Sequence, residues 1–189
     1  MTLFSCASVR NGFTSAELAL INEADGIMRV LTIENEKDLE VLRAQSTELP
    51  ASVIASEDYK KLTDLMVATV THPSQDGVGI AAPQVGINRR VVAVQRFDKE
   101  GYPFEVYPNI RIVWKSDSLE AGTEGCLSVP DKSGDVMRSQ DIVIEYASAG
   151  GPDDSIEMVR DTVKGFTAVI FQHEVDHLEG VLYIDRIEK

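Results

Sequence analysis

Histidine and cysteine are scarce in this chain, which has three histidines and two cysteines among its 189 residues. The cysteines, Cys6 and Cys126, lie far apart, and one pair does not make a disulfide framework in a chain of this length. A chain this long buries roughly 70% of the surface that its unfolded state exposes, so its core needs no disulfide or structural metal. We therefore expect reduced cysteines, and any metal site has few thiol or imidazole ligands to draw on.

Basic residues are also few: 18 lysines and arginines stand against 31 acidic residues, which gives a formal net charge of −13. A surface this negative repels phosphate backbones, which argues against direct binding of nucleic acid. Hydrophobic residues (43%) and charged residues (26%) occur in the proportions of ordinary soluble domains, and no membrane span is expected. No basic segment followed by an apolar stretch precedes Cys6, so we expect no export signal and a cytoplasmic location.

Helical patterns are found in the first third of the chain and at its end. Ser56 provides a cap, and Glu57 and Asp58 place negative charge at the start of one helix. Apolar residues then recur at helical spacing until His72-Pro73 ends the pattern. The expected helices span residues 14–23, 36–43, 56–71 and 166–179, and the last of them ends before Gly180.

Between these helices the sequence has the residue types of strands, expected over residues 90–97, 104–114, 136–146 and 156–164. Residues 98–101 supply a hairpin turn for the first pair, and residues 148–154 join the second pair. Strands in the middle and a helix at the end favour an α+β fold. Its antiparallel sheets would pack around the C-terminal helix that carries a His-Glu-x-x-His (HExxH) motif.

That motif is His173-Glu174-Val175-Asp176-His177. Positions i and i+4 lie one turn apart on the same face of a helix, so both imidazoles can reach one metal ion. Glu174 lies at the rim of that face, where it can handle protons on water at the metal. The alternative is two histidines satisfied by hydrogen bonds in a buried helix. The metal hypothesis is favoured because two of the three histidines lie on a face otherwise made of Phe, Val and Ile.

Two histidines leave a catalytic metal site one protein ligand short. Metalloproteases with this motif usually take the third ligand from further along the chain. The residues after His177 contain no His or Cys, and only carboxylates remain there, which weakens the protease hypothesis. Cys126, in the segment EGCLS at 124–128, is the remaining candidate. Considered alone, this cysteine is better interpreted as a buried, inert thiol.

A third segment, GVGIAAPQVG at residues 77–86, surrounds Gln84 with small residues. Its three glycines indicate a close approach of the backbone to a ligand. It is not a phosphate-binding loop, because it lacks the Lys-Ser/Thr ending. Considered alone, the segment is interpreted as a structural turn.

Together these segments resemble the three signature motifs of peptide deformylases, in the same order: GVGIAAPQVG at 77–86, EGCLS at 124–128 and QHEVDHLEG at 172–180. The resemblance covers a domain at residues 27–189 and leaves residues 1–26 as an N-terminal extension. It implies an α+β fold and a metal-dependent hydrolase. The expected reaction removes the N-formyl group from N-formyl-methionyl peptides of newly made proteins and releases formate.

The resemblance also implies roles for individual residues. The metal ligands are Cys126, His173 and His177. Glu174 takes a proton from the attacking water and passes it to the departing amine. Gln84, through its side-chain amide, and Leu127, through its backbone N–H, donate to the oxyanion. The substrate-binding residues are Val78, Gly79, Gly125, Val169 and Ile170. For Val169 and Ile170, plain helix core is an equally good interpretation. Arg138 and Asp176 are a candidate ion pair that holds the helix, and plain surface charge is the alternative.

The implied cofactor is one divalent metal ion, with Fe²⁺ favoured and Zn²⁺, Ni²⁺ or Co²⁺ able to use the same ligands. The implied partners are nascent or released N-formyl-Met peptides. The sequence lacks the basic C-terminal helix with which some family members dock on the ribosome. With the net charge of −13, we therefore expect at most transient proximity to the ribosome, and we expect a monomer.

Two other functions stay open from the sequence. A zinc peptidase using the same two histidines would not need Cys126. A catalytically silent module that binds peptide or metal would be expected to have lost Glu174 or Gln84, and both are present.

Overall fold

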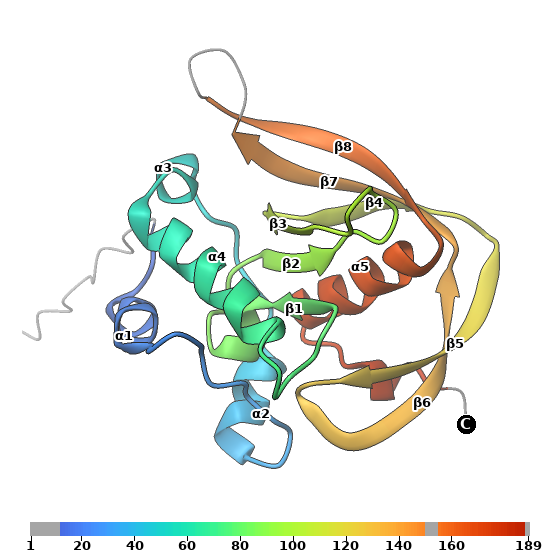
Figure 1. The fold of residues 1–189 in the computed structure, drawn as a ribbon, viewed down its shortest axis with the longest axis horizontal. Helices are drawn as coiled ribbons and strands as arrows, with labels where there is room; N and C mark the ends of the chain where they lie inside the picture. Colours follow the sequence, from blue (N-terminus) through green and yellow to red (C-terminus); the bar gives the residue numbers. More distant parts are fainter. Residues whose placement is uncertain (1–11, 150–154, 188–189) are drawn as a thin grey trace, which may run out of the picture.

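The structure is a computed structural model that describes residues 12–149 and 155–187 of the chain (Figure 1). Cys6, residues 1–11 of the expected N-terminal extension and residues 150–154 of the expected turn lie outside the described residues. The helices are α1 (Ser15–Glu23), α2 (Glu36–Leu42), α3 (Ala51–Ile54), α4 (Glu57–Val70) and α5 (Gly165–Leu178), with the short 3-10 helices η1 (Ala82–Val85) and η3 (Tyr183–Asp185). The strands are β1 (Gly79–Ala81), β2 (Val91–Gln95), β3 (Phe104–Pro108), β4 (Arg111–Lys115), β5 (Leu119–Cys126), β6 (Val129–Ser139), β7 (Asp141–Ala149) and β8 (Ile156–Lys164).

All strand pairs among these elements are antiparallel. They form three sheets, with strand orders β1-β2-β3, β4-β7-β8 and β5-β6. The expected fold class is confirmed: antiparallel sheets surround the C-terminal helix α5, as can be followed in Figure 1. The structure also confirms the four expected helices, with ends within a few residues of the predicted ones.

The sheet β1-β2-β3 is covered on both faces, which explains the run of four apolar, buried residues at 91–94 in β2. Val91 and Ala93 on one face pack with the buried side of α4. Val92 and Val94 on the other face pack with α5, which also contacts β7 and β8 through Phe171 and its neighbours. Helix α5 therefore lies between two sheets and is buried along most of its length.

Two predicted strands are each divided in the structure. Residues 104–114 form β3 and β4, which belong to different sheets. The break is at Asn109, whose φ of 54° is left-handed and whose side chain binds the backbone N and O of Leu49, each at 2.8 Å. Residues 136–146 likewise divide at Gln140, so that β6 pairs with β5 and β7 pairs with β8. The sequence pattern did not predict strand β5, which carries Cys126, nor the short elements β1 and α3.

No helix within the described ranges combines the length and the hydrophobicity that crossing a bilayer requires.

Candidate metal centre and catalytic pocket

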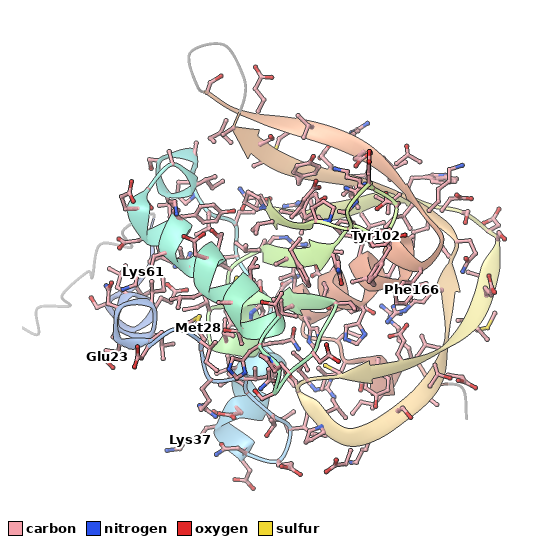
Figure 2. The ribbon with its side chains drawn as sticks, viewed as in Figure 1. Glu23, Met28, Lys37, Lys61, Tyr102 and Phe166 are labelled. Atoms are coloured by element: carbon pink, nitrogen blue, oxygen red, sulfur yellow. The ribbon has the colours of Figure 1, made fainter. Side chains whose placement is uncertain are left out.

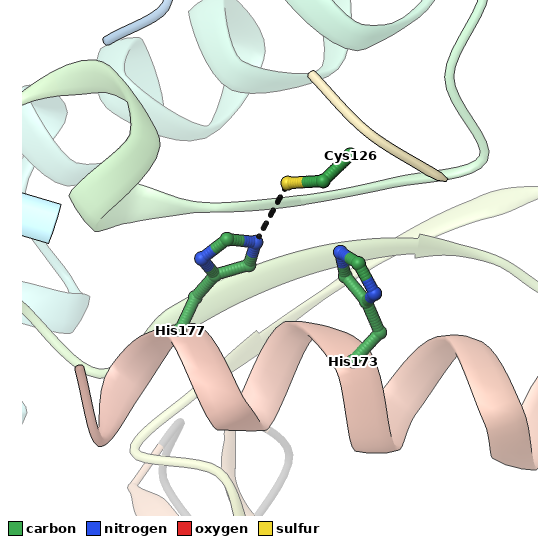
Figure 3. Close-up of side chains that lie close together, drawn as sticks. All are labelled: Cys126, His173 and His177. Carbon is green, nitrogen blue, oxygen red and sulfur yellow. Dashed lines mark hydrogen bonds between the residues drawn. The ribbon is translucent and has the colours of Figure 1, made fainter. Parts of the chain in front are cut away.

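Helix α5 brings His173 and His177 to one face, with ring centroids 5.1 Å apart (Figure 3). The spacing of four residues places the two rings one turn apart, as expected. The helix ends cleanly after His177 because Gly180 adopts a left-handed conformation, with φ of 70°. Both imidazoles face the end of β5.

Cys126 is the last residue of β5, and the pairing of β5 with β6 shifts register between Gly125 and Cys126. Its Sγ lies 3.3 Å from Nε2 of His177 (Figure 3). One ligand atom from each of Cys126, His173 and His177 lies within 4.8 Å of the other two. The structure thus brings together the three residues that the sequence assigned to the metal, from two elements far apart in the chain.

The donor set fits a divalent transition metal. Two imidazole nitrogens and one thiolate sulfur suit zinc, iron, cobalt and nickel, whereas calcium and magnesium require oxygen ligands. Nδ1 of His177 is buried without a hydrogen-bond partner in the described part of the chain. Burial, followed by the charges of His173 and Arg138, lowers the pKa of His177 well below its ordinary value. The His177 ring is therefore neutral, which is the form that binds metals.

The ring of His173 is oriented by Glu124, a residue for which no role was predicted from the sequence. Oε2 of Glu124 lies 2.8 Å from Nδ1 of His173. Burial tends to raise the pKa of Glu124, but hydrogen bonds from Arg138 and His173 outweigh it and lower the pKa to about 2. Glu124 is therefore an ionised acceptor, so Nδ1 of His173 donates and Nε2 is left for the metal. Strand periodicity offered a signal, because Glu124 and Cys126 are two residues apart.

Protons compete with a metal at His173. Burial tends to lower the pKa of His173, but hydrogen bonds with Cys126 and Glu124 outweigh it and raise the pKa to about 10. A metal ion must displace this proton, so binding is accompanied by proton release.

Glu174 is buried, with 4% of its surface exposed, and its Oε2 has no hydrogen-bond partner within the described residues. Burial is the main cause that raises its pKa to about 7. A carboxyl group with this pKa exchanges protons readily near neutral pH, which a general base and acid must do. Glu174 follows His173 directly on α5 and lines the same cavity as Cys126 and His173.

The amide of Gln84 is fixed on η1 with its NH2 group toward the thiol. Oε1 accepts a hydrogen bond from the backbone N–H of Ala81 at 2.8 Å. This bond orients Nε2, which lies 3.2 Å from Oγ of Ser128 and 3.6 Å from Sγ of Cys126. The Leu127 N–H next to the thiol has no acceptor in the part of the chain that the structure describes. Both N–H groups are therefore placed beside Cys126 as donors for a ligand.

A cavity of about 390 Å³ lies over this cluster. Its walls contain all five residues predicted to bind substrate: Val78, Gly79, Gly125, Val169 and Ile170. Phe166, in the first turn of α5 and 58% exposed, also lines the cavity and was not predicted to do so (Figure 2). The signal was available, because Phe166 lies three residues before Val169 on the same helical face.

The remaining sequence assignments outside the cluster also have clear positions. Arg138 binds Asp176 on α5 at 2.6 Å, and both side chains are buried, so they form an ion pair inside the protein and not on its surface. His72 is exposed after the end of α4, and its Nδ1 contacts Oγ of Ser74. His72 takes no part in the metal cluster.

The family model for polypeptide deformylase matches residues 27–189. The chain is 36% identical to the peptide deformylase of Leptospira biflexa over 169 residues, covering 86% of this chain and 88% of that one. It is 37% identical to the peptide deformylase of Halothermothrix orenii over 160 residues, covering 85% and 95% of the two chains.

Solved structures of peptide deformylases also match this chain. A Met-Ala-Ser bound class I type b peptide deformylase from Acinetobacter baumannii matches with a TM-score of 0.73 and 35% identity, over 85% of this chain and 98% of that chain. A peptide deformylase from Thermotoga maritima matches with a TM-score of 0.73 and 33% identity, over 87% and 100%.

Proposed function

The chain belongs to the polypeptide deformylase family, whose members are metal-dependent hydrolases that remove the N-formyl group from newly made peptides, and we propose that the Cys126, His173 and His177 cluster with Glu174 carries this reaction. The observation that supports this assignment best is the convergence of these side chains at a single cavity. We propose residues 27–189 as the catalytic domain and residues 1–26 as an extension to it.

Cys126, His173 and His177 would hold one divalent metal ion. When bound, such an ion acts as a Lewis acid that lowers the pKa of water and polarises a carbonyl group. We propose Fe²⁺ as the ion in cells, with Zn²⁺, Ni²⁺ and Co²⁺ able to use the same ligands. By affinity alone iron would lose to zinc, so metal availability must decide between them.

The substrate is a peptide that begins with N-formyl-methionine. The A. baumannii structure holds Met-Ala-Ser, a peptide with the free N-terminal methionine that deformylation produces. In this chain the apolar wall made by Val78, Val169 and Ile170 is suited to the methionine side chain. Gly79 and Gly125 lie where the peptide backbone would pass, with the formyl group directed toward Cys126.

Glu174 accepts a proton from the water that attacks the formyl carbon. It then returns the proton to the amine as the carbon–nitrogen bond breaks, which yields formate and a free N-terminal methionine. Burial suits Glu174 to both steps, because its raised pKa of about 7 lets it bind and release a proton near neutral pH.

Gln84 and Leu127 stabilise the negative charge that develops on the formyl oxygen. The Nε2 group of Gln84 is held by the bond that Ala81 makes to the other end of the amide, so the donor is oriented before the substrate arrives. The Leu127 N–H is a second donor on the neighbouring strand end. Preoriented donors of this kind contribute strongly to acyl-transfer catalysis.

We further propose a cytoplasmic monomer that meets nascent or released chains with at most transient proximity to the ribosome. The net charge of −13 supports this, because it opposes stable contact with ribosomal RNA.

Release of formate from formyl-Met-Ala-Ser by metal-loaded protein tests the proposed function. We expect formate in a one-to-one ratio with free Met-Ala-Ser and no cleavage of the Met–Ala bond. Cleavage of that bond without formate would support the zinc peptidase instead. Peptide binding with neither product would support the silent module.

A further inference from the structure

Arg186 follows η3 near the end of the described chain and binds Asp176 of α5 with two hydrogen bonds. Its Nε lies 2.5 Å from Oδ2 and its Nη2 lies 2.6 Å from Oδ1. The Asp176 side chain is only 9% exposed, whereas the Arg186 side chain is 41% exposed. This two-point pairing of a guanidinium with a carboxylate fixes both groups in geometry as well as in charge.

Asp176 is also the first member of a charged path that ends at a metal ligand. Its Oδ2 accepts a hydrogen bond from Nη1 of Arg138 at 2.6 Å. Arg138 donates two more bonds to Glu124, at 2.7 and 2.9 Å. Glu124 in turn accepts from Nδ1 of His173 at 2.8 Å. Arg186 is thus connected to His173 by an unbroken series of charge-assisted hydrogen bonds.

Among the carboxylate and guanidinium groups of this path, the charges balance only if Arg186 is counted. Arg138 is a single buried cation, 3% exposed, between the two buried carboxylates of Glu124 and Asp176. Arg186 supplies the second cation. Without it, Asp176 would be a buried carboxylate that depends on Arg138 alone, which is costly. Arg138 would be drawn toward Asp176, and its hold on Glu124 would weaken.

We propose that Arg186 is a positioning residue for the metal ligand His173, acting through Asp176, Arg138 and Glu124. Glu124 fixes the tautomer and the ring orientation of His173, and Arg138 fixes Glu124. Arg186 keeps Arg138 available for that task. The inference rests on the proposed function, because it assigns His173 as a metal ligand.

Arg186 acts from outside the substrate pocket. It lines a separate cavity of about 720 Å³, together with Lys115 and Glu179, and it is absent from the walls of the catalytic cavity. A change at Arg186 should therefore alter the metal centre and kcat while leaving the KM for peptide unchanged. It also means that solvent and small cations have access to the position that the guanidinium occupies.

The test compares Arg186→Ala with Arg160→Ala. Arg160 also makes an ion pair, through a single hydrogen bond to Glu145 at 2.7 Å, but on the hairpin β7-β8 and with its side chain 67% exposed. We expect Arg186→Ala to lower kcat about tenfold with unchanged KM, and to speed the loss of bound cobalt to a chelator by a similar factor, as for other partners of metal ligands. Arg160→Ala should match the unsubstituted protein in both measurements.

Chemical rescue separates positioning from a general loss of structure. Guanidinium chloride at a concentration far below the unfolding range should restore part of kcat in Arg186→Ala, whereas potassium chloride at equal ionic strength should not. The kcat of Arg186→Lys should lie between those of Arg186→Ala and the unsubstituted protein, since lysine keeps the charge and loses the two-point geometry.

The proposal is overturned if Arg186→Ala equals Arg160→Ala in kcat and in cobalt loss. It is also overturned if the activity of Arg186→Ala is lost together with its far-ultraviolet circular dichroism signal and neither guanidinium nor Arg186→Lys restores it. Failure of the proposed function looks different, because the unsubstituted protein would then release no formate. The cobalt-loss comparison would still decide whether Arg186 acts on the metal ligands.

Discussion

Gly79 lies against Glu174 so closely that a Cβ built on Gly79 would be 2.5 Å from Oε1 of Glu174. The same atom would lie 2.8 Å from Cγ2 of Ile170. The glycine of strand β1 therefore leaves room for the carboxylate of Glu174, the proposed general base, in addition to any contact it makes with substrate. The side chains of Glu174 and Ile170 on α5 already occupy the position that a Cβ of residue 79 would take. Any side chain at residue 79 must therefore displace Glu174.

Gly79→Ala is expected to retain metal and to lose activity. Moving a proton-transfer group by about 1 Å can cost about 100-fold in rate, so kcat should fall by roughly that factor. Gly122→Ala is the matched control, because a Cβ there meets nothing within 4 Å. Steady-state kinetics with equal metal content checks the prediction, and an unchanged kcat in Gly79→Ala would show that Glu174 does not depend on this contact.

Gln84→Leu should lower kcat by about 100-fold to 1,000-fold, the usual effect of removing one oxyanion donor. The size of the side chain is kept, so the pocket remains filled. Gln45→Leu serves as the control, since Gln45 is exposed and binds Glu179 away from the cavity. If Gln84→Leu retains full kcat, the oxyanion depends on other donors, and the role proposed for Gln84 is wrong.

Cys126→Ala and His177→Ala should each reduce bound metal well below one ion per chain and abolish formate release. The reason is that two remaining ligands hold a catalytic metal poorly. His72→Ala should keep both the bound metal and the formate release, because His72 is exposed and outside the cluster. Metal analysis beside the formate assay distinguishes these outcomes. Retention of metal together with peptide-bond cleavage in Cys126→Ala would favour the peptidase.

The buried pair of Glu124 and Arg138 predicts a loss of stability in acid. In the folded protein the pKa of Glu124 is about 2, below its ordinary value of 4.5. Because the folded pKa is the lower one, the stabilisation is fully present above about pH 4.5 and is lost as the pH falls toward 2. A shift of this size corresponds to about 3 kcal/mol at neutral pH.

Urea unfolding between pH 2 and 7 measures this contribution. The difference in unfolding free energy between the unsubstituted protein and Glu124→Gln should be large at pH 7 and should shrink toward pH 2. Glu120 is an exposed residue on the same strand, and the unfolding free energy of Glu120→Gln should stay close to that of the unsubstituted protein over the whole pH range. A difference for Glu124→Gln that does not change with pH would contradict the assigned ionisation.

Much of the site could be predicted because its signals are local. His173 and His177 are four residues apart on one helix, and that spacing alone brings their rings together. Long-range contacts gave no such signal. The pairing of Arg186 with Asp176, and that of Arg138 with Glu124, depends on how α5, β5, β6 and the segment after η3 meet in space.

The fold was predictable to a similar extent. Helix caps and apolar spacing gave the helices, because capping groups and buried faces are set by nearby residues. The strands were harder to delimit. Residues 104–114 have continuous strand character, and only the left-handed Asn109, held by Leu49 from a distant loop, divides them between two sheets. Such a break depends on a tertiary contact that spacing does not reveal.

The most direct test of the account is formate release from formyl-Met-Ala-Ser by Glu174→Ala and by the unsubstituted protein, each loaded with the same metal to the same content. Glu174 is not one of the proposed metal ligands, so the variant should bind metal normally while its kcat falls by about 100-fold to 10,000-fold. Formate release by Glu174→Ala at the rate of the unsubstituted protein would contradict the central claim that this buried carboxylate moves the proton in deformylation.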